Sequence, residues 1–178
     1  MKFSEMPYTR PDYPAISQEL DKLTQRLGQA SSAQEQADLY KEFETLLSHL
    51  NTQTTLCYIR HTVNTNDSFY EEENDYNDQQ MPLMEEKVKN FQKVLMDSPY
   101  RKELEELLGI LLFQNMELEM KGFSPEIVPL MQEENKLASE YQKLYASARI
   151  PFMEKTVTVA QLGPYKESTD RVTRRAAL

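Results

Sequence analysis

The chain has two histidines, His49 and His61, and metal-dependent hydrolysis would have to start from them. A zinc-peptidase helix carries His-Glu-x-x-His, in which both histidines bind zinc and the glutamate is the general base. Here a leucine follows His49, a threonine follows His61, and the two histidines are twelve residues apart. The glutamate that di-iron bundles place three residues before a histidine is replaced by leucine and tyrosine. We therefore predict no catalytic and no metal-binding residue in this chain.

Cys57 is the one cysteine, and it lies four residues before His61. The two side chains could share one helix face, and a cysteine–histidine pair can form an activated nucleophile. Cys57 also continues an apolar stripe, however, and a buried cysteine more often packs as a small hydrophobic residue. We expect packing here. A single cysteine with no apolar signal segment in residues 1–7 favours a reducing compartment, the cytoplasm.

The densest mixture of polar and aromatic residues runs from Ile59 to Asp78. We take five of its members as candidate ligand contacts: Arg60, His61, Asn64, Tyr70 and Asn74. A guanidinium could pair with a peptide carboxylate, and a tyrosine could stack or form a hydrogen bond. The alternative is an internal network that fixes a helix-to-helix corner, with Asp67 capping the second helix and the acidic run only solvating it.

The composition limits the possible partners. The 178 residues fit one domain or one module, and 39% hydrophobic residues can form a core. The net charge of −9 and the pI near 4.8 argue against nucleic acid or an anionic membrane as partner. The longest apolar cluster, residues 107–113, is too short to span a bilayer.

Apolar residues at helical spacing predict the elements that position these side chains. We expect five helices, at about residues 15–28, 33–63, 67–96, 99–121 and 125–148. Ser32 with Glu35 forms a capping box for the second helix, and Pro82 predicts a kink or break in the third. Ser98 should cap the fourth helix, whose leucines make it the most buried.

After residue 148 the pattern changes. Short apolar runs on either side of residues 154–155 predict a hairpin. Residues 162–165 are expected to form a loop or single turn, and residues 168–170 cap a last helix that begins at Arg171. The predicted fold class is mainly α: an antiparallel helical bundle of five or more helices with a small β-hairpin near the carboxyl terminus.

Several stretches, in order along nearly the whole chain, resemble the amino-terminal region of oligoendopeptidase F, in the thimet-oligopeptidase-like family of zinc metallopeptidases. They are Met1–Ser4 with Tyr8 and Arg10–Asp12, Ile59–Thr62, Asp67–Glu71 with Glu73–Tyr76, Phe123–Ile127, Gln132–Leu137 with Ser139–Tyr141, and Gln161–Tyr165 with Asp170–Arg171. The resemblance implies a bacterial, cytoplasmic enzyme that cleaves short peptides.

In that family this region is a helical module that covers one side of a deep substrate channel. The zinc, held by His-Glu-x-x-His and a further glutamate, belongs to a catalytic domain downstream on the same polypeptide. The resemblance therefore implies zinc for the full-length protein and no cofactor here. We divide the chain into a bundle domain, residues 1–148, and residues 149–178, a hairpin with the start of a truncated helix that leads to an absent catalytic domain.

Two hypotheses remain. The first is a non-catalytic, channel-forming domain whose partners are the catalytic domain and short peptides. The second is a free-standing helical interaction module that binds a partner helix in an apolar groove. If the catalytic domain is missing, apolar residues of the hairpin and the last helix should be exposed: Phe152, Val157, Val159, Val172 and Leu178. We then expect either self-association through the carboxy-terminal third or fraying of that third, with residues 1–148 still ordered.

Overall fold

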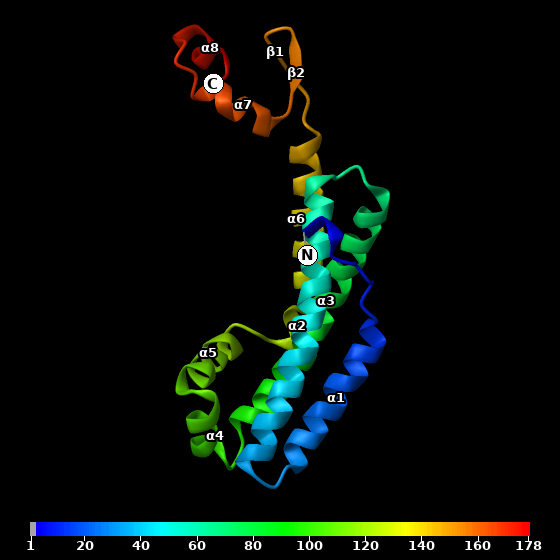
Figure 1. The fold of residues 1–178 in the computed structure, drawn as a ribbon, viewed down its shortest axis with the longest axis vertical. Coiled ribbons are helices and arrows are strands. Elements are labelled where there is room, and N and C mark those ends of the chain that lie inside the picture. The colour runs from blue at the N-terminus through cyan, green and yellow to red at the C-terminus, as the bar shows by residue number, and fades with distance from the viewer. Residues whose placement is uncertain (1–2) are drawn as a thin grey trace.

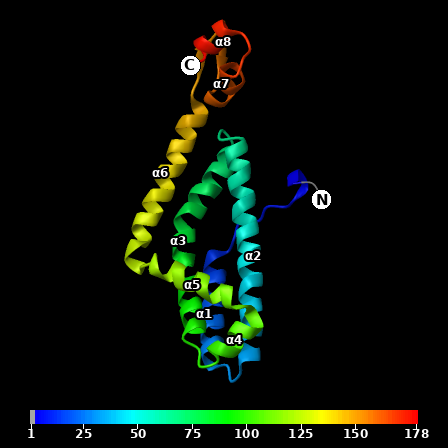
Figure 2. The ribbon, with the colours of Figure 1, turned by 90° about the vertical axis from the view of Figure 1, so that its left-hand side faces the viewer.

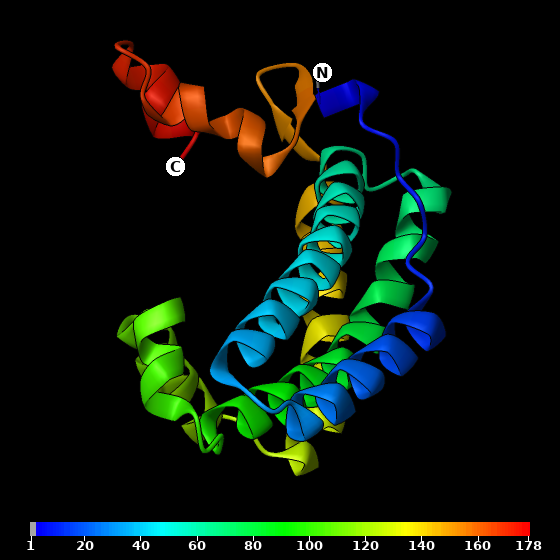
Figure 3. The same cartoon turned by 60° about the horizontal axis from the view of Figure 1, so that its bottom comes forward.

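The computed structural model describes residues 3–178, so Met1 and Lys2 of the resembling stretches lie outside the described residues. Within this range the fold is mainly α, as predicted, with eight α-helices and one two-stranded hairpin. The long helices α2 (Ala33–Val63), α3 (Ser68–Met96) and α6 (Val128–Ser147) form a spine, with α3 in contact with both others. The elements at its two ends project to the same side, which gives the molecule a C shape (Figures 1 and 3).

The first two helices begin close to where the sequence predicts, and a side chain caps each of them. Helix α1 (Tyr13–Gln29) starts two residues before Ala15, and the Asp12 carboxylate accepts a hydrogen bond from the Ala15 N–H at 3.0 Å. The Ser32 hydroxyl accepts from the Glu35 N–H at 3.2 Å at the start of α2. The Glu35 carboxylate accepts from the Ser31 N–H instead of the Ser32 N–H, so the predicted capping box is incomplete.

The main apolar core lies between α1, α2 and α3 and is closed below by the short helices α4 (Arg101–Leu108) and α5 (Ile110–Lys121). The rings of Phe43 and Phe91 stack at its centre, with centroids 4.0 Å apart. Leu20, Leu27 and Leu104 are fully buried around them. This core holds α2 and α3 as one rigid antiparallel pair, and that pair carries the candidate residues.

Helix α3 is not broken at Pro82, and the reason lies in α6. Proline has no N–H, so it cannot donate to the carbonyl of Asp78 four residues earlier. The side-chain amide of Asn135 in α6 donates to that carbonyl at 3.2 Å, and the Gln132 amide donates to the next one, of Gln79, at 2.7 Å. Helix α6 therefore satisfies the backbone that proline leaves free, and α3 continues.

The predicted fourth helix is wrong in two respects. Gly109, with φ of 93°, divides it into α4 and α5, because this left-handed conformation ends a helix and glycine adopts it without strain. The reoriented segment leaves Leu107, Ile110 and Leu111 exposed, so this region is not the most buried one. The N-cap position of α4 is Tyr100, whereas the Ser98 hydroxyl accepts from the Tyr100 N–H at 3.0 Å and donates to the Gln36 side chain.

Helix α6 follows a single 3-10 turn, Pro125–Ile127, and leads into a second, smaller apolar cluster. Strands β1 (Ile150–Phe152) and β2 (Lys155–Val157) pair antiparallel around a turn at Met153–Glu154, whose two positive φ values suit a tight hairpin. Helix α7 (Val159–Lys166) stands where a loop was predicted, and α8 (Arg171–Ala176) begins after Asp170 as predicted.

The hairpin is not an exposed apolar surface, contrary to the prediction. Phe152 and Val157 are buried against Leu162 and Ala177.

The division of the chain at residue 148 stays a prediction. None of the helices between residues 3 and 178 combines the length and apolarity that crossing a membrane requires.

Candidate functional site

The corner between α2 and α3 brings two of the five predicted residues together. The Arg60 guanidinium, at the last turn of α2, donates to the Tyr70 hydroxyl at 2.7 Å and to the backbone carbonyl of Met6. The rings of Tyr8 and Phe69 pack edge-on against Tyr70. These groups line an open depression of about 670 Å³. The partners of Arg60 are thus Tyr70 and the N-terminal arm, residues 3–12, which precedes α1.

The other three predicted residues lie apart from that depression. His61 is fully buried, and both its ring nitrogens lack a hydrogen-bond partner within residues 3–178. Asn64 is exposed at the end of α2, where its N–H donates to the Arg60 carbonyl. Asn74 is buried between α3 and α6. A role of these residues in a substrate channel remains a prediction.

A cluster of polar side chains fixes α6 on α3, and we call it the polar joint: Glu71, Asn74 and Asp78 of α3 with Ser139 and Lys143 of α6. The Asp78 carboxylate accepts hydrogen bonds from the Ser139 hydroxyl at 2.6 Å and from the Asn74 amide at 3.0 Å. Burial raises the pKa of Asp78, while the Ser139 bond and the nearby His61 oppose that rise. At the open end of the joint, Lys143 pairs with Glu71 at 3.0 Å. The joint borders a depression of about 460 Å³ between the two helices.

The prediction missed the most heavily bonded carboxylate at the corner, Glu73. It is 3% exposed and accepts hydrogen bonds from the Tyr8 hydroxyl at 2.6 Å and from Arg10 Nε at 2.9 Å. The Arg10 guanidinium is the largest cause that lowers the pKa of Glu73. The sequence does hold one signal: Glu73 and Asn77 lie four residues apart on α3, and Asn77 accepts from Tyr13, also in the proline-rich N-terminal part. This network fastens the N-terminal arm to the helix pair.

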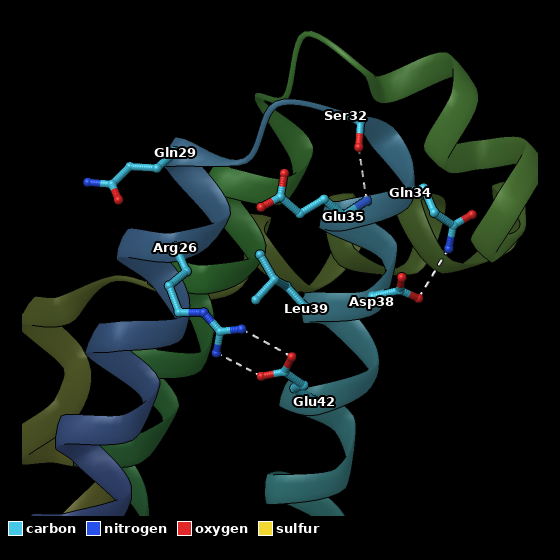
Figure 4. A pocket seen from close by; sticks show the side chains of 8 residues that line it. All are labelled: Arg26, Gln29, Ser32, Gln34, Glu35, Asp38, Leu39 and Glu42. Carbon is cyan, nitrogen blue, oxygen red and sulfur yellow. Dashed lines mark hydrogen bonds and ion pairs between the residues drawn. The ribbon is translucent and has the colours of Figure 1, made fainter.

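A further pocket lies at the other end of the helix pair, between α1 and α2 (Figure 4). Arg26 of α1 pairs with Glu42 of α2 at 2.7 Å. Asp38 accepts from the Gln34 amide at 3.1 Å within α2. Both Arg26 and Glu42 are about half exposed. We assign the Arg26–Glu42 pair to holding the two helices together.

Metal binding and nucleophilic attack are the two kinds of chemistry that the histidines and the cysteine could support. Residues 3–178 contain no group of three or more histidine, cysteine, aspartate or glutamate side chains placed to hold a metal ion, so they do not fit a catalytic zinc. Burial raises the pKa of the Cys57 thiol to about 11, which keeps it protonated and unreactive at neutral pH. The expectation that Cys57 packs in the core is confirmed.

Comparison with known proteins gives a consistent result. Residues 3–123 match the family described as Peptidase M3 N-terminal domain. The structure of Pz peptidase A with inhibitor 2 is 43% identical, with a TM-score of 0.94, and the match covers 99% of this chain and 31% of that one. A structure assigned as oligoendopeptidase F is 42% identical, with the same TM-score and coverage. Another so assigned, from Bacillus anthracis strain Ames, is 34% identical, with a TM-score of 0.94 and coverage of 99% and 32%.

No curated protein sequence matches the chain. The chain spans about a third of the length of the three solved structures.

Proposed function

Because the chain belongs to the peptidase M3 N-terminal domain family, we propose that it is the non-catalytic, channel-forming domain of an enzyme that hydrolyses short peptides. The resemblance to oligoendopeptidase F inferred from the sequence is confirmed. The observation that carries the proposal is that all but 1% of this chain superposes, with a TM-score of 0.94, on only a third of a peptidase. A segment with that relation to an enzyme is one part of its architecture.

The shape of the molecule supports the role of a wall. Helices α4 and α5 at one end and the hairpin with α7 and α8 at the other project to the same side of the α2–α3–α6 spine (Figure 1). Viewed from that side, α4 and α5 lie across α1 and α2, and α7 and α8 lie beyond the end of α6 (Figure 2). A rigid spine with two projecting ends is suited to contact a second domain on two sides and to narrow the path of substrates to it. The catalytic domain of the same polypeptide is the partner in this proposal, and short peptides in the cytoplasm are the substrates.

The zinc of the proposed enzyme belongs to residues outside this chain, because the described residues offer no ligand set for it. The proposed role of this chain is to select substrates by limiting which peptides can reach the catalytic domain. Arg60 and Tyr70 are the residues we propose for contact with peptide, since both line an open depression and Arg60 keeps donors beyond its two bonds. His61 and Asn74 act in positioning, because both are buried.

The test compares two proteins on fluorogenic peptides. The isolated chain, with and without added zinc, should show no hydrolysis. A chimera in which this chain replaces the matched third of Pz peptidase A should hydrolyse them. Chelator-sensitive turnover by the isolated chain would refute the proposal. An inactive but folded chimera would favour the free-standing interaction module.

A further inference from the structure

Helix α6 is amphipathic, but its polar side faces the neighbouring helix and its apolar side faces away from the molecule. The side that faces α3 is polar, with Gln132, Asn135, Ser139 and Lys143 all bonded to α3. The side that faces away is apolar and is between 48% and 71% exposed: Leu130, Leu137, Tyr141, Leu144 and Tyr145. An amphipathic helix normally turns its apolar stripe to the core. Only Val128 and Ser139 of α6 are buried, so the main core has no place for this stripe.

The stripe is closely spaced from Leu137 to Tyr145, over about 12 Å at 1.5 Å per residue. Leu130 lies two turns before Leu137, and the exposed Glu133 and Glu134 lie between them. The Tyr141 and Tyr145 rings lie side by side, with centroids 6.3 Å apart. A continuous apolar patch of several hundred Å² is unusual on a soluble monomer and indicates a covered surface.

We infer that the outward stripe of α6 is the surface that packs against the part of the peptidase chain outside the matched third. This inference rests on the proposed function. Three observations identify the occupant. The solved peptidases are about three times as long as this chain, so most of their residues are available to cover it. The polar side of α6 is already bonded to α3. Helix α6 is also the connection between the main core and residues 150–178.

The geometry defines the chemistry of the covering surface. The stripe consists of three leucines and two tyrosines, with the tyrosines toward its carboxyl-terminal end, so we expect a partner surface that is aliphatic and offers hydrogen-bond acceptors to the two phenolic hydroxyls. In this arrangement α6 is the middle layer between the helix pair and the rest of the enzyme. Its polar contacts fix it on one side and its apolar contacts on the other.

The test measures solvent access to Tyr141 by hydroxyl-radical footprinting of the isolated chain and of the Pz peptidase A chimera. Tyr141 is 66% exposed here, so its oxidation rate should fall by roughly fivefold or more in the chimera, as for a residue in the core of an interface. The triple variant Leu137→Gln, Tyr141→Gln, Leu144→Gln should leave the unfolding midpoint of the isolated chain unchanged and lower that of the chimera. Val63→Gln, an 81% exposed site on α2, is the control and should change neither.

Equal oxidation of Tyr141 in both proteins would overturn the inference. Protection of Tyr141 in the isolated chain, with dimers in sedimentation, would overturn it in favour of a second copy. If the chimera does not fold, the same footprint on intact Pz peptidase A, at the positions aligned with Tyr141 and Leu144, decides the question. Failure of the proposed function is distinguishable, since a protected Tyr141 in an inactive chimera would refute the peptidase role and support the interface.

Discussion

Asn135→Ala should lower the local stability of α6. In a Pro82→Ala background the same substitution should have little effect on that stability. Pro82 leaves the Asp78 carbonyl without a helical donor, and the Asn135 amide donates to it at 3.2 Å. A neutral hydrogen bond contributes about 0.5–1.5 kcal/mol, and a buried acceptor left unpaired costs about 1–3 kcal/mol. Asn135 is half-buried, so water can partly replace its amide, and we expect a loss of about 1 kcal/mol.

The assay is native-state hydrogen exchange of the α6 amides. A loss of about 1 kcal/mol lowers their protection about fivefold, since about 1.4 kcal/mol corresponds to a factor of ten. In the Pro82→Ala background position 82 regains its N–H, which bonds to the Asp78 carbonyl, so Asn135→Ala should then change protection by less than about twofold.

Gln132→Ala is the matched control. Its amide donates to the Gln79 carbonyl, whose own helical donor, the Leu83 N–H, is present in both backgrounds. Its effect should therefore be the same whether proline or alanine occupies position 82. An Asn135→Ala effect of equal size in both backgrounds would refute the reasoning, because the Asn135 amide would then not be replacing the missing helical bond.

Three further predictions concern the pH response, the thiol and the corner. Burial raises the pKa of Asp78. Its contribution to the stability of the α3–α6 joint is therefore complete below the ordinary aspartate pKa of about 3.9 and is lost as the pH rises through the raised native value. The stability of α6 measured by hydrogen exchange should fall over that pH window, and Asp78→Asn should remove this pH dependence. Cys57, with its pKa raised to about 11, should react with a thiol reagent at pH 8 only after denaturant unfolds the chain; rapid labelling of the native protein would contradict its burial. Arg60→Ala should cost about 1–2 kcal/mol in urea unfolding, because it leaves the Met6 carbonyl and the Tyr70 hydroxyl without their donor; an unchanged midpoint would mean that water replaces both bonds.

The sequence predicts those parts of the fold that local signals determine. Ser32, Asp67 and Asp170 each cap the helix expected after them, because capping acts within three residues. Gly109 was not foreseen as a break, since a single glycine among leucines is usually tolerated in a helix. Helix α7 has a capping box of Thr158 and Gln161, but the alternation of threonine and valine before it resembles a strand.

The candidate site was harder to predict because its bonds join distant parts of the chain. Arg60 bonds to Met6, 54 residues away, and Glu73 to Arg10, 63 residues away. No spacing rule relates such pairs. The apolar spacing of α6 predicts a helix correctly, but which face turns inward depends on α3: on the Asp78 carbonyl that Pro82 leaves free and on the Asp78 carboxylate.

We propose that this chain limits access to a catalytic domain elsewhere in the enzyme. The most direct measurement compares the Pz peptidase A chimera with the same enzyme lacking the matched third, using a short fluorogenic peptide and an unfolded protein such as reduced casein. The account predicts that the chimera cleaves the peptide and spares the protein, while the shortened enzyme loses that preference. Equal preference in both enzymes would contradict the claim that this domain narrows the channel.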